Sequence, residues 1–165
     1  MEITYLGGDK FKIKGKTGVV SVDSIVVVIE NLEGHKKEIM GPGEYEISGI
    51  SVIGIQNDDL TIFVYEVDGL RVCNLGKTSK KLIESKLSML GDIDVLLLSV
   101  SDISVELIQQ IDPYFVIPFN FKEDSLDKFL KSSGLVVEKL PKFSLKKEEI
   151  IDDQTTEIKL LESRS

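Results

Sequence analysis

The feature that most constrains the fold is a change in hydrophobic period about halfway along the chain. Up to Cys73, short β-branched runs alternate with Gly, Asp or Asn, which predicts strands joined by tight turns. The expected strands cover residues 3–6, 11–14, 19–22, 25–29, 44–47, 50–55, 61–67 and 70–73. An Asp-Gly pair at 68–69 favours a two-residue hairpin turn. The first half is therefore expected to be largely antiparallel.

After Cys73 the pattern changes to alternating helix and strand. Apolar residues recur at helical spacing over 82–90, with an N-cap expected at Thr78 or Ser79 and a stop at Gly91. Further helices are expected over 104–110 and 126–131, strands over 95–99, 114–117, 135–137 and 157–161, and irregular or partly helical chain over 142–151. The sequence thus predicts one α/β (α+β) domain over residues 1–165, with two central sheets and helices on their outer faces.

Charge and composition exclude several classes of function. The chain has 20 Lys and Arg against 28 Asp and Glu, and this net charge of -8 opposes binding to nucleic acid or to anionic membranes. No segment approaches the ~18 apolar residues of a membrane span, and no signal peptide is evident. A single cysteine, Cys73, excludes an internal disulfide and fits a reducing compartment. We expect a soluble, cytoplasmic protein.

Seven short sequence blocks follow one another in a recognisable order. They cover residues 3–7, 11–13, 41–52, 64–76, 90–98, 117–121 and 126–130. In these blocks the chain resembles the metallo-β-lactamase fold superfamily, and within it the L-ascorbate-6-phosphate lactonase-like branch of Zn-dependent hydrolases. The resemblance implies a four-layer αββα sandwich, here shortened. It also implies hydrolysis by a metal-activated water.

The metal ligands that this resemblance implies are replaced at almost every position. Those positions correspond to Glu30, Leu32, Gly34, His35, Lys77 and Asn120. Only His35, the single histidine of the chain, keeps the ligand type of the family. An ammonium group at Lys77 about 4 Å from a divalent cation would cost roughly 8 kcal/mol at an effective dielectric constant near ~20. We therefore expect no metal, no other cofactor and no catalytic residue.

One hypothesis places the Lys77 ammonium in the position of the lost metal, with Glu30, Asn120 and His35 as its partners. The simpler interpretation of His35 is a surface imidazole at the start of a loop. Replacing His35 with alanine is then predicted to leave any activity and most of the stability intact.

Other polar residues have simpler interpretations beside functional ones. Glu30, Glu33, Asp58 and Asp59 would supply the oxygen ligands of a Mg²⁺ or Ca²⁺ site, although acidic loop residues are usually just solvated. Cys73 lies in a buried-strand pattern and is expected to behave as a small hydrophobe. The Gly-Pro-Gly at 41–43 predicts a tight turn rather than a phosphate-binding loop, and residues 99–102 are expected to cap the following helix.

These observations favour a degenerate, non-catalytic relative of metallo-β-lactamase-fold hydrolases that acts through binding or assembly, with an unknown protein partner or by self-association. The alternative is a hydrolase with an atypical metal site or without metal. A third class, nucleic-acid processing, is disfavoured by the acidic charge and by the missing ligands.

Overall fold

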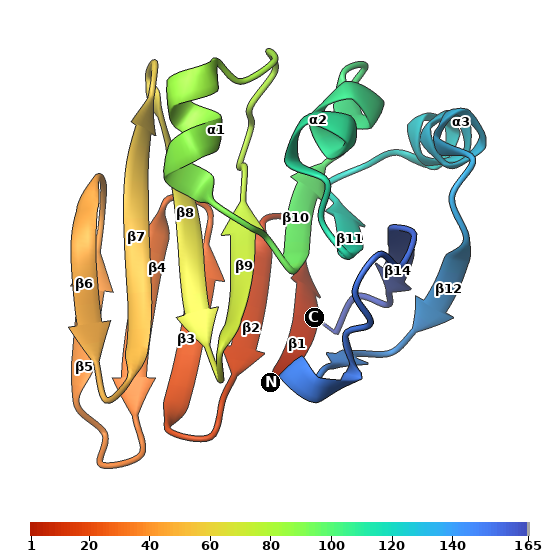
Figure 1. The fold of residues 1–165 in the computed structure, drawn as a ribbon. Helices are drawn as coiled ribbons and strands as arrows, with labels where there is room; N and C mark the ends of the chain where they lie inside the picture. The colour runs from red at the N-terminus through yellow and green to blue at the C-terminus, as the bar shows by residue number, and fades with distance from the viewer. Residues whose placement is uncertain (165) are drawn as a thin grey trace.

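Two β-sheets packed face to face form the framework of the protein (Figure 1). The structure is a computed structural model, and it describes residues 1–164. The first sheet has the strand order β13-β1-β2-β3-β4-β5, and the second has the order β12-β14-β11-β10-β9-β8-β7-β6. The strands of the first sheet are β1 (Glu2–Gly7), β2 (Lys10–Lys14), β3 (Gly18–Asp23), β4 (Val26–Asn31), β5 (Lys36–Ile39) and β13 (Phe143–Ser144). Those of the second are β6 (Gly43–Ile47), β7 (Ile50–Asn57), β8 (Leu60–Val67), β9 (Leu70–Asn74), β10 (Val95–Ser99), β11 (Phe115–Phe119), β12 (Val137–Leu140) and β14 (Glu157–Leu161).

Loop length sets the direction of each strand. Strands β1 to β5 are joined by short turns and pair antiparallel, as do β6 to β9. The pairing is parallel among β9, β10, β11, β14 and β12. Between these strands a helix or a long connection returns the chain to the same end of the sheet before the next strand begins. The antiparallel first half and the alternating second half are as the sequence predicts.

Three α-helices cover the outer face of the eight-stranded sheet, as Figure 1 shows. They are α1 (Glu84–Leu90), α2 (Ser104–Ile111) and α3 (Glu123–Ser133), and a 3-10 turn, η1, covers Lys147–Glu149. Their apolar residues pack in one cluster with the outer residues of β8 to β11. No helix among residues 1–164 covers the outer face of the six-stranded sheet. The expected αββα sandwich therefore lacks its helical layer on that side. None of the described helices is long and apolar enough to cross a membrane.

The main core lies between the two sheets. In β2, Phe11 and Ile13 are fully buried, whereas the three lysines that alternate with them are exposed. Period-2 alternation of this kind puts one face of the strand in the core and the other in water. Burying each of these apolar side chains stabilises the folded state by about 1.5–3 kcal/mol relative to leaving it exposed.

A few elements differ from the prediction. Helix α1 begins at Glu84 rather than near Thr78, because the Thr78 hydroxyl donates to the Leu75 carbonyl oxygen at 2.6 Å and stabilises a turn instead. Strand β5 was not expected, since three of its four residues are charged; it forms because it pairs with β4 along its whole length. The late strand expected at 135–137 begins only at Val137.

Candidate functional site

A cleft of about 340 Å³ opens at the end of the sandwich where β9 and β11 have their carboxyl ends. Its wall comes from both sheets and is lined by Asp9, Ser24, Ile25, Met40, Gly41, Asp59, Leu60, Thr61, Phe63, Asn74, Gly76, Lys77 and Phe119. The carboxyl ends of parallel strands are a common place for ligands, since the loops that follow them diverge there. The volume is within the range of small-molecule pockets.

Two very short hairpin turns form part of the rim. Asp23 pairs with Val26, and Asn57 pairs with Leu60, so each connection has only two residues. The first central residue of each turn, Ser24 or Asp58, has a left-handed backbone with φ of 54° or 53°. Turns this short leave no length for a loop that carries several ligands.

The segment that joins the two sheets passes close to β7. A Cβ atom on Gly54 would lie 2.5 Å from the Gly41 carbonyl oxygen, so glycine at this position allows the chain to pass. The chain bends at Gly41 and Pro42 before β6 begins at Gly43, and Met40 just before the bend lines the cleft.

The walls of the cleft are largely apolar. Phe63 and Phe119 are buried at 4% and 2% exposure, and the Phe119 ring meets Phe11 edge-on at 5.1 Å. Ile25 and Met40 line the mouth at 69% and 63% exposure. A β-branched residue in a hairpin turn is unusual where nothing covers it, because turns favour Gly, Asn, Asp and Ser. The mouth of the cleft therefore has exposed apolar surface.

Three charged side chains, Asp9, Asp59 and Lys77, line the cleft. None of them makes an ion pair within 4.0 Å with another described residue. The Oδ2 atom of Asp9 accepts one long hydrogen bond from the Ser24 hydroxyl at 3.5 Å. Its Oδ1 atom is buried and accepts none from any described residue.

Tyr5 links the β1–β2 turn, beside Asp9, to Asn120. The Tyr5 hydroxyl donates to the Gly8 carbonyl oxygen at 2.9 Å and accepts from the backbone N–H of Asn120 at 3.5 Å. Burial raises the pKa of Tyr5 above its usual value, the N–H of Asn120 opposes this, and the charge of Asp9 adds to it. Asn120 itself is exposed and has a left-handed backbone, directly after cleft residue Phe119. The structure thus brings Asn120 and Lys77 to the same end of the molecule.

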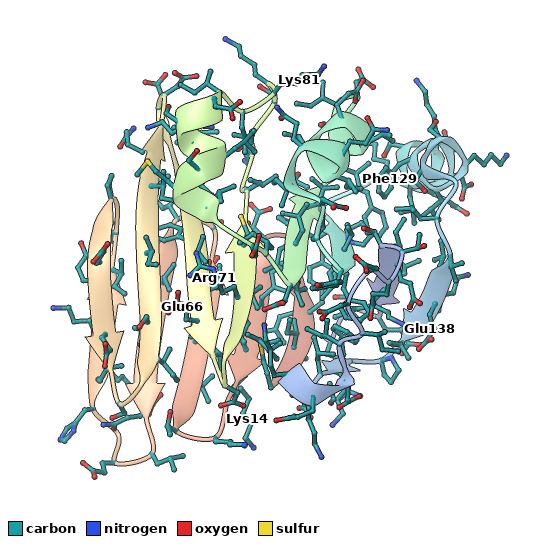
Figure 2. All side chains as sticks on the ribbon, viewed as in Figure 1. Lys14, Glu66, Arg71, Lys81, Phe129 and Glu138 are labelled. Atoms are coloured by element: carbon teal, nitrogen blue, oxygen red, sulfur yellow. The ribbon has the colours of Figure 1, made fainter. Side chains whose placement is uncertain are left out.

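The other predicted site residues lie at the opposite end. Strand β4 starts at Val26 beside the cleft and runs away from it to Asn31, about 16 Å further on at ~3.3 Å per residue. In Figure 2, Lys14 marks the end of the sandwich at which Asn31 pairs with Gly18. Lys81 marks the opposite end, to which the segment 74–83 leads from β9. Glu30, Leu32, Gly34 and His35 are therefore remote from the cleft.

His35 belongs to a hairpin loop between β4 and β5. The Asn31 side-chain oxygen accepts the backbone N–H groups of Glu33 at 3.1 Å and His35 at 2.9 Å, which holds the loop. The imidazole is 71% exposed, with Nδ1 3.6 Å from a carboxylate oxygen of Glu33. Glu30 is paired with Lys36 at 3.8 Å. The hypothesis that Glu30 and His35 are partners of Lys77 is wrong, because the β3–β4 hairpin reverses the chain before these residues are reached.

The described residues do not fit the zinc of the family. They contain no group of three or more His, Cys, Asp or Glu side chains that would hold a metal ion. In the cleft, two carboxylates stand with an ammonium and no imidazole. The suggested oxygen-rich cation site is not formed either, since Asp58 and Asp59 lie at the cleft end and Glu30 and Glu33 at the other.

Two further candidates have structural roles. Burial raises the pKa of the Cys73 thiol to about 12, partly offset by the charge of Arg71, so Cys73 stays a neutral thiol within the helix-covered core. The backbone N–H of Ser101 donates to the Ser104 hydroxyl at 2.8 Å where α2 begins. The prediction that residues 99–102 cap this helix is wrong, because its N-cap position is Ile103 and no side chain makes a capping hydrogen bond there.

Sequence reasoning missed Asp9, Ile25 and Met40 as cleft residues. A signal was present for Ile25: only two residues separate the runs at 19–22 and 25–29, whereas a parallel crossover needs a dozen or more. That spacing fixes the β3–β4 turn at the carboxyl end of β3 and sends residues 30–35 to the other end.

Comparisons with known proteins agree with this fold. A family model described as the β-lactamase superfamily domain matches residues 26–120, which is more than half of the chain. A crystal structure of a candidate Zn-dependent hydrolase of the metallo-β-lactamase superfamily from Thermotoga maritima superposes with a TM-score of 0.77 at 19% identity, over 98% of each chain. No curated protein matches the sequence. The chain therefore belongs to the β-lactamase superfamily, and its two packed sheets with helices have the metallo-β-lactamase fold.

Proposed function

We propose that this protein is a pseudoenzyme of the superfamily, a non-catalytic binding protein that holds a ligand in the cleft between its sheets. The observation that carries the proposal is the set of polar groups in the cleft: Asp9, Asp59 and Lys77 without any histidine or cysteine. Within the superfamily, the order of the sequence blocks supports the lactonase-like branch as the origin of this degenerate site.

The chemistry of the superfamily requires a metal ion to lower the pKa of a water molecule and to polarise the substrate. Lys77 brings a positive charge to the wall of the cleft, which opposes a divalent cation there. A covalent mechanism would need a nucleophile beside a base. Cys73 is buried in the helix-covered core, and His35 lies in a loop at the far end, so neither supplies one.

A binding role is favoured over self-association because the edge strand of the eight-stranded sheet is acidic and opposes pairing with a second copy. Strand β6 is the edge, and its Glu44 and Glu46 are exposed. Two copies pairing antiparallel through β6 would place these carboxylates opposite each other, which opposes edge-to-edge association. The net charge of -8 supports neither a nucleic-acid nor a membrane partner, and a buried free thiol suits the reducing cytoplasm we propose as its location.

The proposal is tested by assaying the purified chain against a panel of lactones, β-lactams and phosphodiesters, each with added Zn²⁺, with added Mn²⁺ and with chelator. We expect no turnover above the buffer rate under any of the three conditions. Turnover that appears with metal and disappears with chelator would overturn the proposal in favour of an atypical metallohydrolase. Turnover that survives chelator and is lost in Asp9→Asn would overturn it in favour of a metal-free hydrolase.

A further inference from the structure

We infer that the ligand of the cleft is an organic amine in its ammonium form that carries an apolar body. The inference rests on the proposed function, since it names the class of molecule that the binding site accepts. It is carried by two carboxylates without basic partners in an apolar, aromatic-lined cleft.

The charged side chains that line the cleft leave an excess of negative charge, since two carboxylates stand against one ammonium. Asp23, close by on β3, is paired with Lys10 at 4.0 Å, whereas Asp9 and Asp59 have no basic group within that distance. Asp9 is half-buried, and its buried Oδ1 atom has no donor among the described residues. A buried acceptor left without a donor costs about 1–3 kcal/mol. An ammonium group in the cleft would offset part of that cost through its charge.

The apolar surroundings select an amine with a hydrophobic body over a small hydrated cation. Phe63 and Phe119 form aromatic walls, and ring faces attract an ammonium group. Ile25 and Met40 are exposed at the mouth and would lose contact with water when an apolar body enters. Methionine adapts to varied ligand shapes because its chain is unbranched and flexible.

Lys77 limits where the ligand charge can lie. Its side chain is exposed, so its ammonium is hydrated and screened by salt, whereas the charge of half-buried Asp9 is screened less. Repulsion from Lys77 directs a ligand ammonium toward Asp9 and Asp59. The net charge of -8 favours approach of cations over anions in general.

The test uses three probes of matched size, 2-phenylethylamine, 2-phenylethanol and 3-phenylpropionate, titrated calorimetrically into the full chain at neutral pH. We expect the amine to bind saturably and at least tenfold more tightly than the alcohol, and the carboxylate to bind more weakly than the alcohol. Asp9→Asn is expected to lower the affinity for the amine at least tenfold and to leave that for the alcohol unchanged. Asp23→Asn, which removes a carboxylate already paired with Lys10, is the matched control and should change neither more than twofold.

Three results would overturn the inference: no saturable binding of the amine, tighter binding of the carboxylate than of the amine, or equal effects of Asp9→Asn and Asp23→Asn. If Asp9→Asn fails to fold, Asp59→Asn replaces it, because Asp59 is exposed in a turn and its loss leaves the core intact; a loss of less than twofold in amine affinity then counts against the inference. Failure of the amine leaves the proposed function standing, since the turnover assay tests that separately.

Discussion

The two ends of the β-sandwich are built from the same kind of tight turn, yet they differ in how their polar groups are satisfied. At the end that carries the 31–35 loop, Asp68 binds the N-terminal ammonium at 3.1 Å and the Lys16 N–H at 2.9 Å, and Asn31 holds its own loop. At the cleft end, the Oδ1 atom of Asp9 has no donor among the described residues, and the exposed Ile25 and Met40 line the cleft. The first pattern contributes to stability alone, whereas the second leaves groups available to a ligand.

The largest effect on stability is expected inside the cleft wall. Phe119→Ala removes a buried ring that meets Phe11 edge-on, and we expect the free energy of unfolding to fall by about 3–5 kcal/mol in urea melts. Phe119→Leu, which keeps more of the apolar volume, is the control and should lose clearly less. Equal losses in the two variants would show that the ring is not part of a packed wall.

The next effect is expected at the opposite end and depends on pH. Burial alone would raise the pKa of the Asp68 carboxyl, but the Lys16 N–H and the N-terminal ammonium outweigh it and hold the pKa below its usual value of 3.8. This carboxylate therefore contributes stability above pH ~4 that is lost as pH falls through the lowered pKa. We expect Asp68→Asn to cost about 1 kcal/mol at pH 7. Asparagine suits the left-handed backbone of this turn, so the backbone is not strained.

The difference in unfolding free energy between Asp68→Asn and the parent chain should shrink as pH falls from about 5 to about 2, because the parent loses the same charge by protonation. Chemical melts across this range measure it. A difference that stays constant with pH would show that the carboxylate charge contributes nothing at this end.

A smaller, stabilising effect is expected in the β3–β4 turn at the cleft. Ser24 has a left-handed backbone with φ of 54°, a conformation that costs an L-residue about 1–2 kcal/mol and glycine very little. After the extra freedom of glycine in the unfolded chain is subtracted, Ser24→Gly should raise the unfolding free energy by about 0.5–1 kcal/mol. Ser24→Ala keeps a Cβ atom and should give no gain, so a gain in both variants would contradict the explanation by backbone strain.

The smallest effect is expected at His35. Its imidazole is exposed in a loop that Asn31 holds through backbone groups, so His35→Ala should change the unfolding free energy by less than about 0.5 kcal/mol. Amine binding in the cleft should be unaffected, because the loop lies at the other end. A tenfold change in amine affinity would break the comparison between the two ends.

Much of the fold could be predicted from the sequence because local pattern and tertiary structure agree. The run at 157–161 is strand β14, the run at 95–99 is β10, and α3 ends at Gly134, whose left-handed backbone suits glycine. Strand β5 could not be predicted from local pattern, since its charged sequence forms a strand only through pairing with β4. The superfamily itself was predicted correctly from the seven sequence blocks.

The candidate site was predicted less well. Lys77 and Asn120 lie at the same end of the molecule because each follows a strand of the parallel part of the sheet, β9 or β11. Residues 30–35 also follow a strand, but β4 is antiparallel to β3 and points the other way. Position after a strand therefore says nothing about which end of a sandwich a residue occupies until the direction of that strand is known.

Metal content tests the central claim most directly, namely that the cleft is a binding site for organic ligands and no longer a metal site. The chain would be expressed in zinc-supplemented medium, purified without chelator, and analysed by mass spectrometry for metal bound per chain. We predict less than about a tenth of an equivalent of any transition metal, since the described residues supply no group of three metal-binding side chains. Near-stoichiometric zinc that survives dialysis and is lost from Asp9→Asn but not from His35→Ala would contradict the account.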